Sequence, residues 1–351
     1  MNKLTSALLL AAALMTAFSS CEKTPQEDVQ PAARELTVLF SPGGSFSGAG
    51  YDDAILKAVM ESAATNQNFV FRLLRPGTLA EARSQAQKWQ ADADDMDALI
   101  LCGPQYEDLA GSLKPEKGRV LLLDSDKSFA DGVASIQLKR YGGAYLAGAL
   151  SHPFQMLLIK ALNGDRMLDT VAGGIEEGYQ DAGGEYLEQL VLSDSYAGLN
   201  MPDQLFNQLF EGFTGLKFGG DTPMLTGEAC LVPVCGASRA GAYSYSRNMF
   251  TVSLGIGEDC SAYSEMLPYS LIFNLGAVVK DYIQSWIKEE SWPAHADFGL
   301  STGHVGILYN PRFFEEKTGM VYNYKLLLED YKKLEAQYLK TALEKEARYA
   351  Y

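Results

Sequence analysis

Short apolar runs alternate with stretches of helical periodicity along most of the chain. Apolar runs that end at glycine, proline or a polar residue are typical of buried strands. They fall at residues 36–40, 69–72, 98–102, 120–124, 133–136, 170–172, 190–192, 229–234, 250–254 and 305–308. Helical spacing of apolar positions falls at 51–65, 79–89, 106–113, 142–162, 176–182, 203–213, 275–288 and 324–347. This alternation predicts an α/β fold with parallel sheets, in two lobes of similar size.

The first strand and helix enclose a glycine-rich loop. The strand at 36–40 runs into Pro42-Gly43-Gly44, and Asp52 and Asp53 open the helix that follows. Open α/β sheets bind ligands at the carboxyl ends of their strands, so this loop is a candidate wall of a ligand site. The alternative is a simple strand-to-helix turn that contacts no ligand.

The N-terminal residues have the pattern of an export signal. One positive charge at Lys3 precedes an apolar run at 8–18, which is too short to span a bilayer comfortably. The run ends in small residues and Cys21, an arrangement that resembles a bacterial lipobox. We expect a signal peptide over 1–20, lipidation of Cys21, a polar tether over 21–34, and an exported, lipid-anchored protein of the bacterial envelope. An ordinary secretory signal with a chance cysteine is the alternative.

Composition excludes several classes of partner and chemistry. The net charge of −15 argues against nucleic acid and against an anionic membrane surface. Cys102, Cys230, Cys235 and Cys260 form no metal-ligand spacing, so we expect buried thiols, with one disulfide as the alternative. No nucleotide-phosphate loop and no nucleophile–histidine motif occurs. We therefore expect no enzyme, no cofactor and no metal.

Several collinear segments resemble one family. They are GGSFSGAGYDDAI from Gly43, VLLLD from Val120, GVASIQLKRYGGAYLAG from Gly132, GGIEEGYQDAG from Gly173, VPVCGASRAG from Val232 and GLSTGHVGIL from Gly299. They are similar to segments of the basic membrane protein family of bacterial substrate-binding lipoproteins, which includes purine-nucleoside receptors of ABC importers. The resemblance implies a monomeric, two-lobed periplasmic-binding-protein-like fold of type I that closes on a small solute and delivers it to an ABC permease.

The same resemblance implies the lobe limits. Lobe 1 would comprise residues 35–137 with about 258–290, and lobe 2 would comprise 138–257 with about 291–323. A charged C-terminal helix over 324–351 would follow as a solvated flank.

The resemblance also implies the ligand contacts. Tyr51 takes the place of a stacking aromatic ring, with Asp52 after it, and Asp124 takes the place of a strand-end acid. Tyr196 is the second-lobe aromatic residue, and Gly236 with Ser238 forms a glycine turn. Phe46, Tyr106 and Glu258 complete the candidate set. Each tyrosine has a plain core or wall residue as its alternative.

Other positions depart from the family pattern. Ser47-Gly48-Ala49 stands where the family has polar side chains, the ribose-binding acid falls on Ile256, and a later lysine falls near Phe273. A purine nucleoside is therefore one candidate ligand. The alternative function is an envelope lipoprotein with the same fold, a diverged or lost nucleoside site, and no role in transport.

Overall fold

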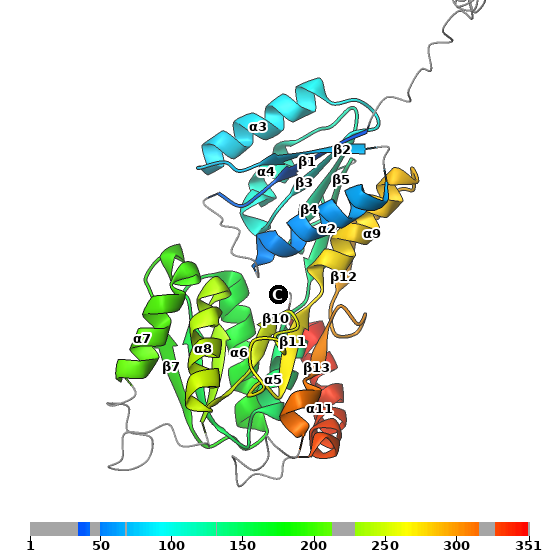
Figure 1. Cartoon of the computed structure of the whole chain (residues 1–351). Helices are drawn as coiled ribbons and strands as arrows, with labels where there is room; N and C mark the ends of the chain where they lie inside the picture. The colour runs from blue at the N-terminus through cyan, green and yellow to red at the C-terminus, as the bar shows by residue number, and fades with distance from the viewer. Residues whose placement is uncertain are drawn as a thin grey trace, which may run out of the picture.

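The computed structural model describes residues 34–42, 50–66, 69–130, 132–212, 229–315 and 327–349. These residues form two α/β lobes that are joined along one side (Figure 1). The signal peptide, Cys21, the tether and Phe46 lie outside the described residues. In the described part of the chain, no helix has the length and apolar character needed to cross a membrane.

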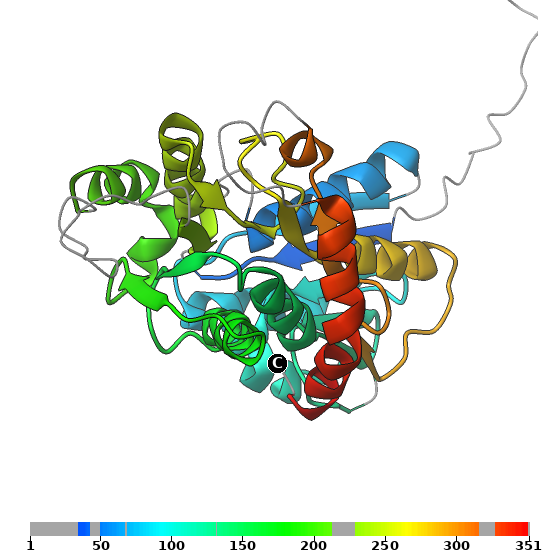
Figure 2. The same ribbon diagram turned by 90° about the horizontal axis from the view of Figure 1, so that it is seen from below.

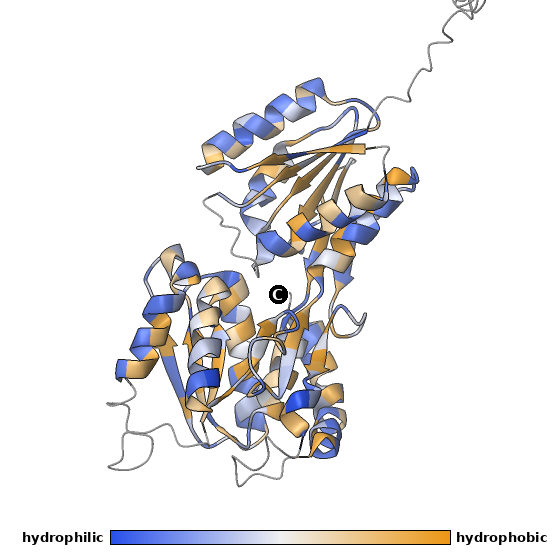
Figure 3. Cartoon of the chain, in the orientation of Figure 1, coloured by the Kyte–Doolittle hydropathy of each residue, from blue (hydrophilic) through white to orange (hydrophobic). Residues whose placement is uncertain are grey.

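The first lobe contains a six-stranded, fully parallel sheet in the order β12-β5-β4-β3-β1-β2. Its strands are β1 (Arg34–Leu39), β2 (Phe69–Leu74), β3 (Ala98–Leu101), β4 (Arg119–Leu123), β5 (Val133–Leu138) and β12 (His295–Phe298). One face packs against α2 (Tyr51–Thr65) and α9 (Leu275–Ile287), and the other packs against α3 (Leu79–Asp92) and α4 (Glu107–Ser112). The central strands are apolar along their length (Figure 3), as expected when helices cover both faces.

The second lobe contains two strand groups, in the orders β7-β6-β8-β9 and β10-β11-β13. The strands are β6 (Gln155–Lys160), β7 (Leu187–Val191), β8 (Ala229–Val234), β9 (Val252–Ser253), β10 (Gly255–Gly257), β11 (Tyr269–Phe273) and β13 (Val305–Tyr309). All pairs are parallel except that of β11 with β13. The helices are α5 (Tyr141–Leu150), α6 (Arg166–Asp181), α7 (Pro202–Gly212), α8 (Arg239–Met249) and α11 (Leu328–Arg348).

The chain passes between the lobes after β5, after β11 and after β12. The lobe limits expected from the sequence differ from the observed strand pairing at two strands, β11 and β12. β11 pairs with β13 in the second lobe, although it was expected in lobe 1. β12 pairs with β5 in the first lobe, although it was expected in lobe 2. The apolar pattern of a short strand does not encode its pairing partner, so the sequence could not assign these two.

Two predicted elements have a different structure. The helix expected over 142–162 ends at Leu150 and is followed by strand β6. The strand expected at 170–172 is the middle of helix α6, whose N-terminus is capped by the Asp165 side chain. In both cases the apolar segment was short, and its pattern was compatible with the periodicity of a helix and with that of a strand.

Glycines allow α5 and α6 to pack backbone against backbone. A Cβ atom added to Gly148 would overlap the carbonyl oxygen of Ile175, and one added to Gly178 would overlap that of Tyr145. Two segments of the family resemblance, GGAYLAG and GGIEEGYQDAG, therefore carry the residues of a helix–helix contact.

We expect Gly178→Ala to lower the free energy of unfolding by about 1–3 kcal/mol, because the added methyl must displace the α5 backbone. Gly173→Ala is the matched control in the same helix, since a Cβ there has no atom within 4 Å. That control should raise the free energy of unfolding by up to about 1 kcal/mol through helix propensity. Urea denaturation of both variants measures the difference, and equal effects would contradict the close helix contact.

The C-terminal helix α11 is not a solvated flank. It packs along α5 (Figure 2), and its buried Glu346 carboxylate accepts hydrogen bonds from the backbone nitrogens of Leu300 (2.6 Å) and Ser301 (3.1 Å). Beyond its end, the Tyr349 ring stacks on Tyr141 with ring centroids 3.9 Å apart. Tyr141 and Leu300 each follow a crossing between the lobes, so this helix braces two of the crossings.

The four cysteines of the described residues are buried and form no disulfide with one another. Burial raises the pKa of the Cys102 and Cys230 thiols, which keeps both in the protonated form. They behave as small apolar core residues.

Candidate functional site between the lobes

The candidate residues lie where strand ends of the two lobes meet. β1 and β4 are parallel members of one sheet, so the start of α2 and the end of β4 share an edge. Figure 1 shows that the start of α2 is directed toward the second lobe. Arg166 at the start of α6 lies 3.6 Å from Asp126, just after β4, and this ion pair joins the lobes.

Asp124 is buried at the end of β4 and is already paired. Its carboxylate accepts hydrogen bonds from Arg140 Nη1 at 2.7 Å and Nη2 at 2.9 Å, and a longer one from the Leu138 backbone nitrogen. Asp124 has φ of 59°, a left-handed conformation that aspartate and asparagine tolerate better than most residues. Arg140 stands on the first crossing and also lies over the Phe273 ring at 5.6 Å. The pair therefore joins β4 to two crossings.

Tyr51 begins α2 beside this pair. Its hydroxyl is buried and makes no hydrogen bond of good geometry to a described residue, although the Asp124 carboxylate lies close to it. Burial raises the pKa of the Tyr51 phenol well above its usual range, and the nearby Asp124 carboxylate raises it further. An unbonded buried hydroxyl at a strand-end edge is a group that a ligand can satisfy.

Asp52 is the second unsatisfied group of α2. The residue is 7% exposed, and its Oδ1 atom is buried without a hydrogen-bond partner among the described residues. Burial and the neighbouring Asp53 raise the pKa of Asp52 to about 7, although Arg75 opposes the shift. Strongly shifted carboxyl groups without a structural partner are common at functional sites. Tyr51 and Asp52 together are the strongest sign of a ligand site.

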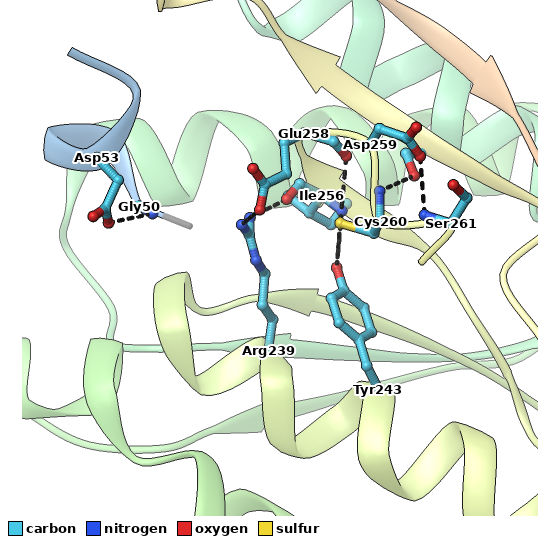
Figure 4. Close-up of polar contacts among 10 residues, drawn as sticks. Gly50, Asp53, Arg239, Tyr243, Ile256, Glu258, Asp259, Cys260 and Ser261 are labelled. Atoms are coloured by element: carbon cyan, nitrogen blue, oxygen red, sulfur yellow. Dashed lines mark hydrogen bonds and ion pairs between the residues drawn. The ribbon is translucent and has the colours of Figure 1, made fainter. Parts of the chain in front are cut away.

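In the second lobe, Glu258 belongs to a network around Arg239. Arg239 donates to Glu258 Oε1 at 2.7 Å and to the Ile256 carbonyl oxygen. The Tyr243 hydroxyl accepts from the Ile256 nitrogen at 3.0 Å and donates to Cys260 Sγ. Figure 4 shows this network together with Gly50 and Asp53 at the start of α2, which come from the other lobe. The Glu258 side chain is 44% exposed.

Three other candidate residues lie in the second lobe: Tyr196 is exposed, whereas Gly236 and Ser238 belong to the turn after β8. Tyr196 is 64% exposed after β7, and its hydroxyl donates to Asp165 at 3.1 Å. Gly236 forms the turn after β8 with φ of 57°. Ser238 is buried and links the Gly198 carbonyl to the Met201 nitrogen.

Tyr106 is a core residue. Its ring has no exposure, and its hydroxyl donates to the Phe40 carbonyl oxygen at 2.5 Å. The tyrosine therefore supports the end of β1, and the expectation that it forms a wall of the ligand site is corrected.

Sequence reasoning missed Arg140 and Arg166. Arg140 lies inside the segment with the most specific family resemblance, and Arg166 opens a helix that was expected to start later. A signal for Arg140 was available in the sequence. An acid, Asp124, follows strand β4, and a basic residue, Arg140, follows the next strand, β5. Among the described residues, no group of histidine, cysteine, aspartate and glutamate side chains could hold a metal ion.

No protein-family model matches the chain, and no curated protein matches its sequence. Several solved structures have a fold similar to that of this chain. A solute-binding protein of an ABC transporter system from Aeropyrum pernix K1 has 15% identity and a TM-score of 0.63, and the match covers 90% of each chain. A second one, from Conexibacter woesei DSM 14684, has 10% identity and a TM-score of 0.59 over 89% of this chain and 97% of that chain.

A transcriptional activator of the comK gene from Bacillus halodurans is also similar, with 8% identity and a TM-score of 0.59 over 88% of this chain and 96% of that chain. Similarity at these identities concerns the fold, because the matching proteins differ in their described roles. The resemblance to the basic membrane protein family stays a prediction. The chain has the two-lobed, periplasmic-binding-protein-like α/β fold that the sequence predicted.

Proposed function

We propose that the protein is a non-enzymatic solute-binding protein that closes its two lobes on a small polar or aromatic solute. One observation carries the proposal: at an edge that faces the other lobe, Tyr51 presents a buried hydroxyl with no well-directed hydrogen bond, and Asp52 presents a buried Oδ1 atom without a partner. Leaving such groups unsatisfied costs about 1–3 kcal/mol each, and a bound ligand removes that cost. Hinge closure around a ligand is a common motion of two-lobed proteins.

The chemistry of these groups favours a ligand with a flat face and a hydrogen-bond donor. The Tyr51 ring suits an aromatic base, and the Asp52 carboxyl accepts from an amino, imino or hydroxyl group. A purine nucleoside combines these features. Tyr196 and Glu258 are the second-lobe groups that would meet such a ligand on closure, since both remain partly exposed.

The cellular role follows from the N-terminal pattern and from the described roles of similar proteins. Lipidation at Cys21 would tether the protein to the bacterial envelope, and an ABC permease would receive the solute. The structures from Aeropyrum pernix and Conexibacter woesei are described as solute-binding proteins of ABC transporter systems, which supports this role.

One observation favours the alternative of an envelope lipoprotein without a nucleoside site. Asp124, the strand-end acid expected to contact the ligand, is occupied on both oxygens by Arg140. A ribose hydroxyl would have to compete with that bidentate pair. A nucleoside-binding protein would need the ligand to reach Asp124 in spite of Arg140, whereas an envelope lipoprotein without a nucleoside site would not.

Thermal denaturation with purine nucleosides, free bases, pentoses and hexoses tests the proposal. A true ligand at a hundredfold excess over its dissociation constant should stabilise the protein by about 2.7 kcal/mol. We expect Tyr51→Ala to abolish the shift, because the stacking face is lost. Tyr338→Ala, which removes a partly buried tyrosine of α11 that packs against α5, is the control and should keep the shift. A protein that no solute in the panel stabilises would favour the alternative function.

A further inference from the structure

A cavity of about 310 Å³ lies in the first lobe, away from the candidate site. It is bounded by the second half of α3 and by the face of β1 and β2 that carries Thr37, Arg72 and Leu74. Its volume is at the lower end of the range for small-molecule sites.

Two of the residues that line the cavity, Gln85 and Trp89, each have a buried polar atom without a partner among the described residues. Trp89 is 7% exposed, and its indole N–H finds no acceptor among the described residues. One turn earlier on α3, the buried Gln85 Oε1 has no donor. The other two tryptophans differ, since Trp286 Nε1 donates to the Met96 carbonyl at 2.9 Å and Trp292 Nε1 donates to the Tyr282 carbonyl at 3.0 Å. An unbonded buried donor and an unbonded buried acceptor one turn apart on α3 suit a molecule that carries both functions.

The rim of the cavity offers one charge of each sign. Lys88 and Asp92 are exposed and stand four residues apart on α3, and neither has an ion-pair partner in the part of the chain that the structure describes. The nearby Arg72 and Glu35 are already paired at 3.0 Å. The unpaired rim charges therefore match a ligand that itself carries both signs.

We propose that this cavity binds a small zwitterion of the amino-acid type. The ligand carboxylate accepts from the Trp89 indole N–H and faces Lys88. Its ammonium group donates to Gln85 Oε1 and faces Asp92. Leu74 and the Trp89 ring give an aliphatic side chain an apolar surface. The proposal is independent of the solute held between the lobes.

Indole ¹⁵N–¹H resonances test it directly, because the chain has only three tryptophans. The probes are glycine, alanine and leucine, with acetate, methylamine and propionamide as single-function controls. We expect the amino acids to move the Trp89 resonance in a saturable way and to leave those of Trp286 and Trp292 in place. Trp89→Phe assigns the resonance.

Lys88→Gln and Asp92→Asn are surface changes that leave the fold intact, and each should weaken binding about tenfold by removing a charged partner. Lys57→Gln, an exposed lysine on α2, is the matched control and should leave the affinity unchanged. A Trp89 resonance that no amino acid moves would overturn the proposal, since water alone then satisfies the cavity. So would equal effects of acetate, methylamine and the amino acids, or charge variants that bind as tightly as the unmodified protein.

Discussion

Asp124→Asn is expected to lower the free energy of unfolding by about 3–5 kcal/mol, because it leaves the buried Arg140 guanidinium without its counter-charge. Asparagine tolerates the left-handed backbone at this position, so the change isolates the charge. Because the pair also fixes the first crossing to β4, the variant should open more readily between the lobes. Urea denaturation measures the stability, and hydrogen exchange at residues 138–141 measures the opening.

The matched control for this prediction is Asp126→Asn. Asp126 also pairs with an arginine, but both side chains are partly exposed and 3.6 Å apart. Its loss should lower stability by less than about 1 kcal/mol. The double variant Asp124→Asn with Arg140→Met should recover much of the lost stability, because no charge is then left buried. Equal losses at Asp124 and Asp126 would show that the Asp124–Arg140 pair behaves as a surface pair.

Asp52→Asn is expected to stabilise the unliganded protein above neutral pH by on the order of 3 kcal/mol. The pKa of Asp52 is raised from 3.8 to about 7 by burial and by Asp53. The folded protein therefore keeps this proton at pH values where the unfolded chain has already lost it. Stability from this group is fully present at low pH, falls as pH rises between these two values, and stays low above them.

Denaturation of both proteins at a series of pH values measures the effect. The difference between Asp52→Asn and the unmodified protein should be small near pH 4 and reach its maximum near pH 8. Asp53→Asn is the control on the next residue, since the Asp53 carboxylate accepts from the Gly50 nitrogen at 2.8 Å and is expected to lose stability when neutralised. A pH-independent difference at Asp52 would mean that its carboxyl ionises normally.

The gain in stability should come with a loss of ligand binding. A buried carboxyl group that weakens the folded state is typical of a residue kept for its function. An amide at this position keeps one acceptor and loses the charge. The ligand found by thermal denaturation should therefore bind Asp52→Asn more weakly, although the unliganded variant is the more stable protein.

Much of the fold could be predicted because buried parallel strands leave a strong signal. The runs ALILC and VLLLD lie in the centre of the first sheet, where helices cover both faces. The pairing of the short strands β11 and β12 could not be predicted, since a short apolar run does not specify its neighbour. The buried role of Glu346 was hidden for a related reason: a glutamate in a charged helix looks solvated until the loop that it binds is known.

The site was harder to predict than the fold. Tyr51 and Asp52 were named from the family resemblance, and their role as ligand contacts stays a prediction, although both have a buried polar atom without a well-directed hydrogen bond. Tyr106 had the same residue type and a similar position, but its hydroxyl points to a backbone carbonyl inside the lobe. The sequence does not show this difference, because side-chain direction at a strand end depends on the packing of the neighbouring helix.

The position of Glu346 also bears on the order in which the molecule assembles. The loop after β12 is held by a residue near the end of α11, and the first sheet is completed only by β12 itself. During synthesis, neither lobe can therefore acquire its full set of contacts until most of the chain has been made. Contacts between residues so distant in sequence slow folding. We expect a nascent chain stopped before residue 295 to be readily digested by proteases, even though its first five strands are complete.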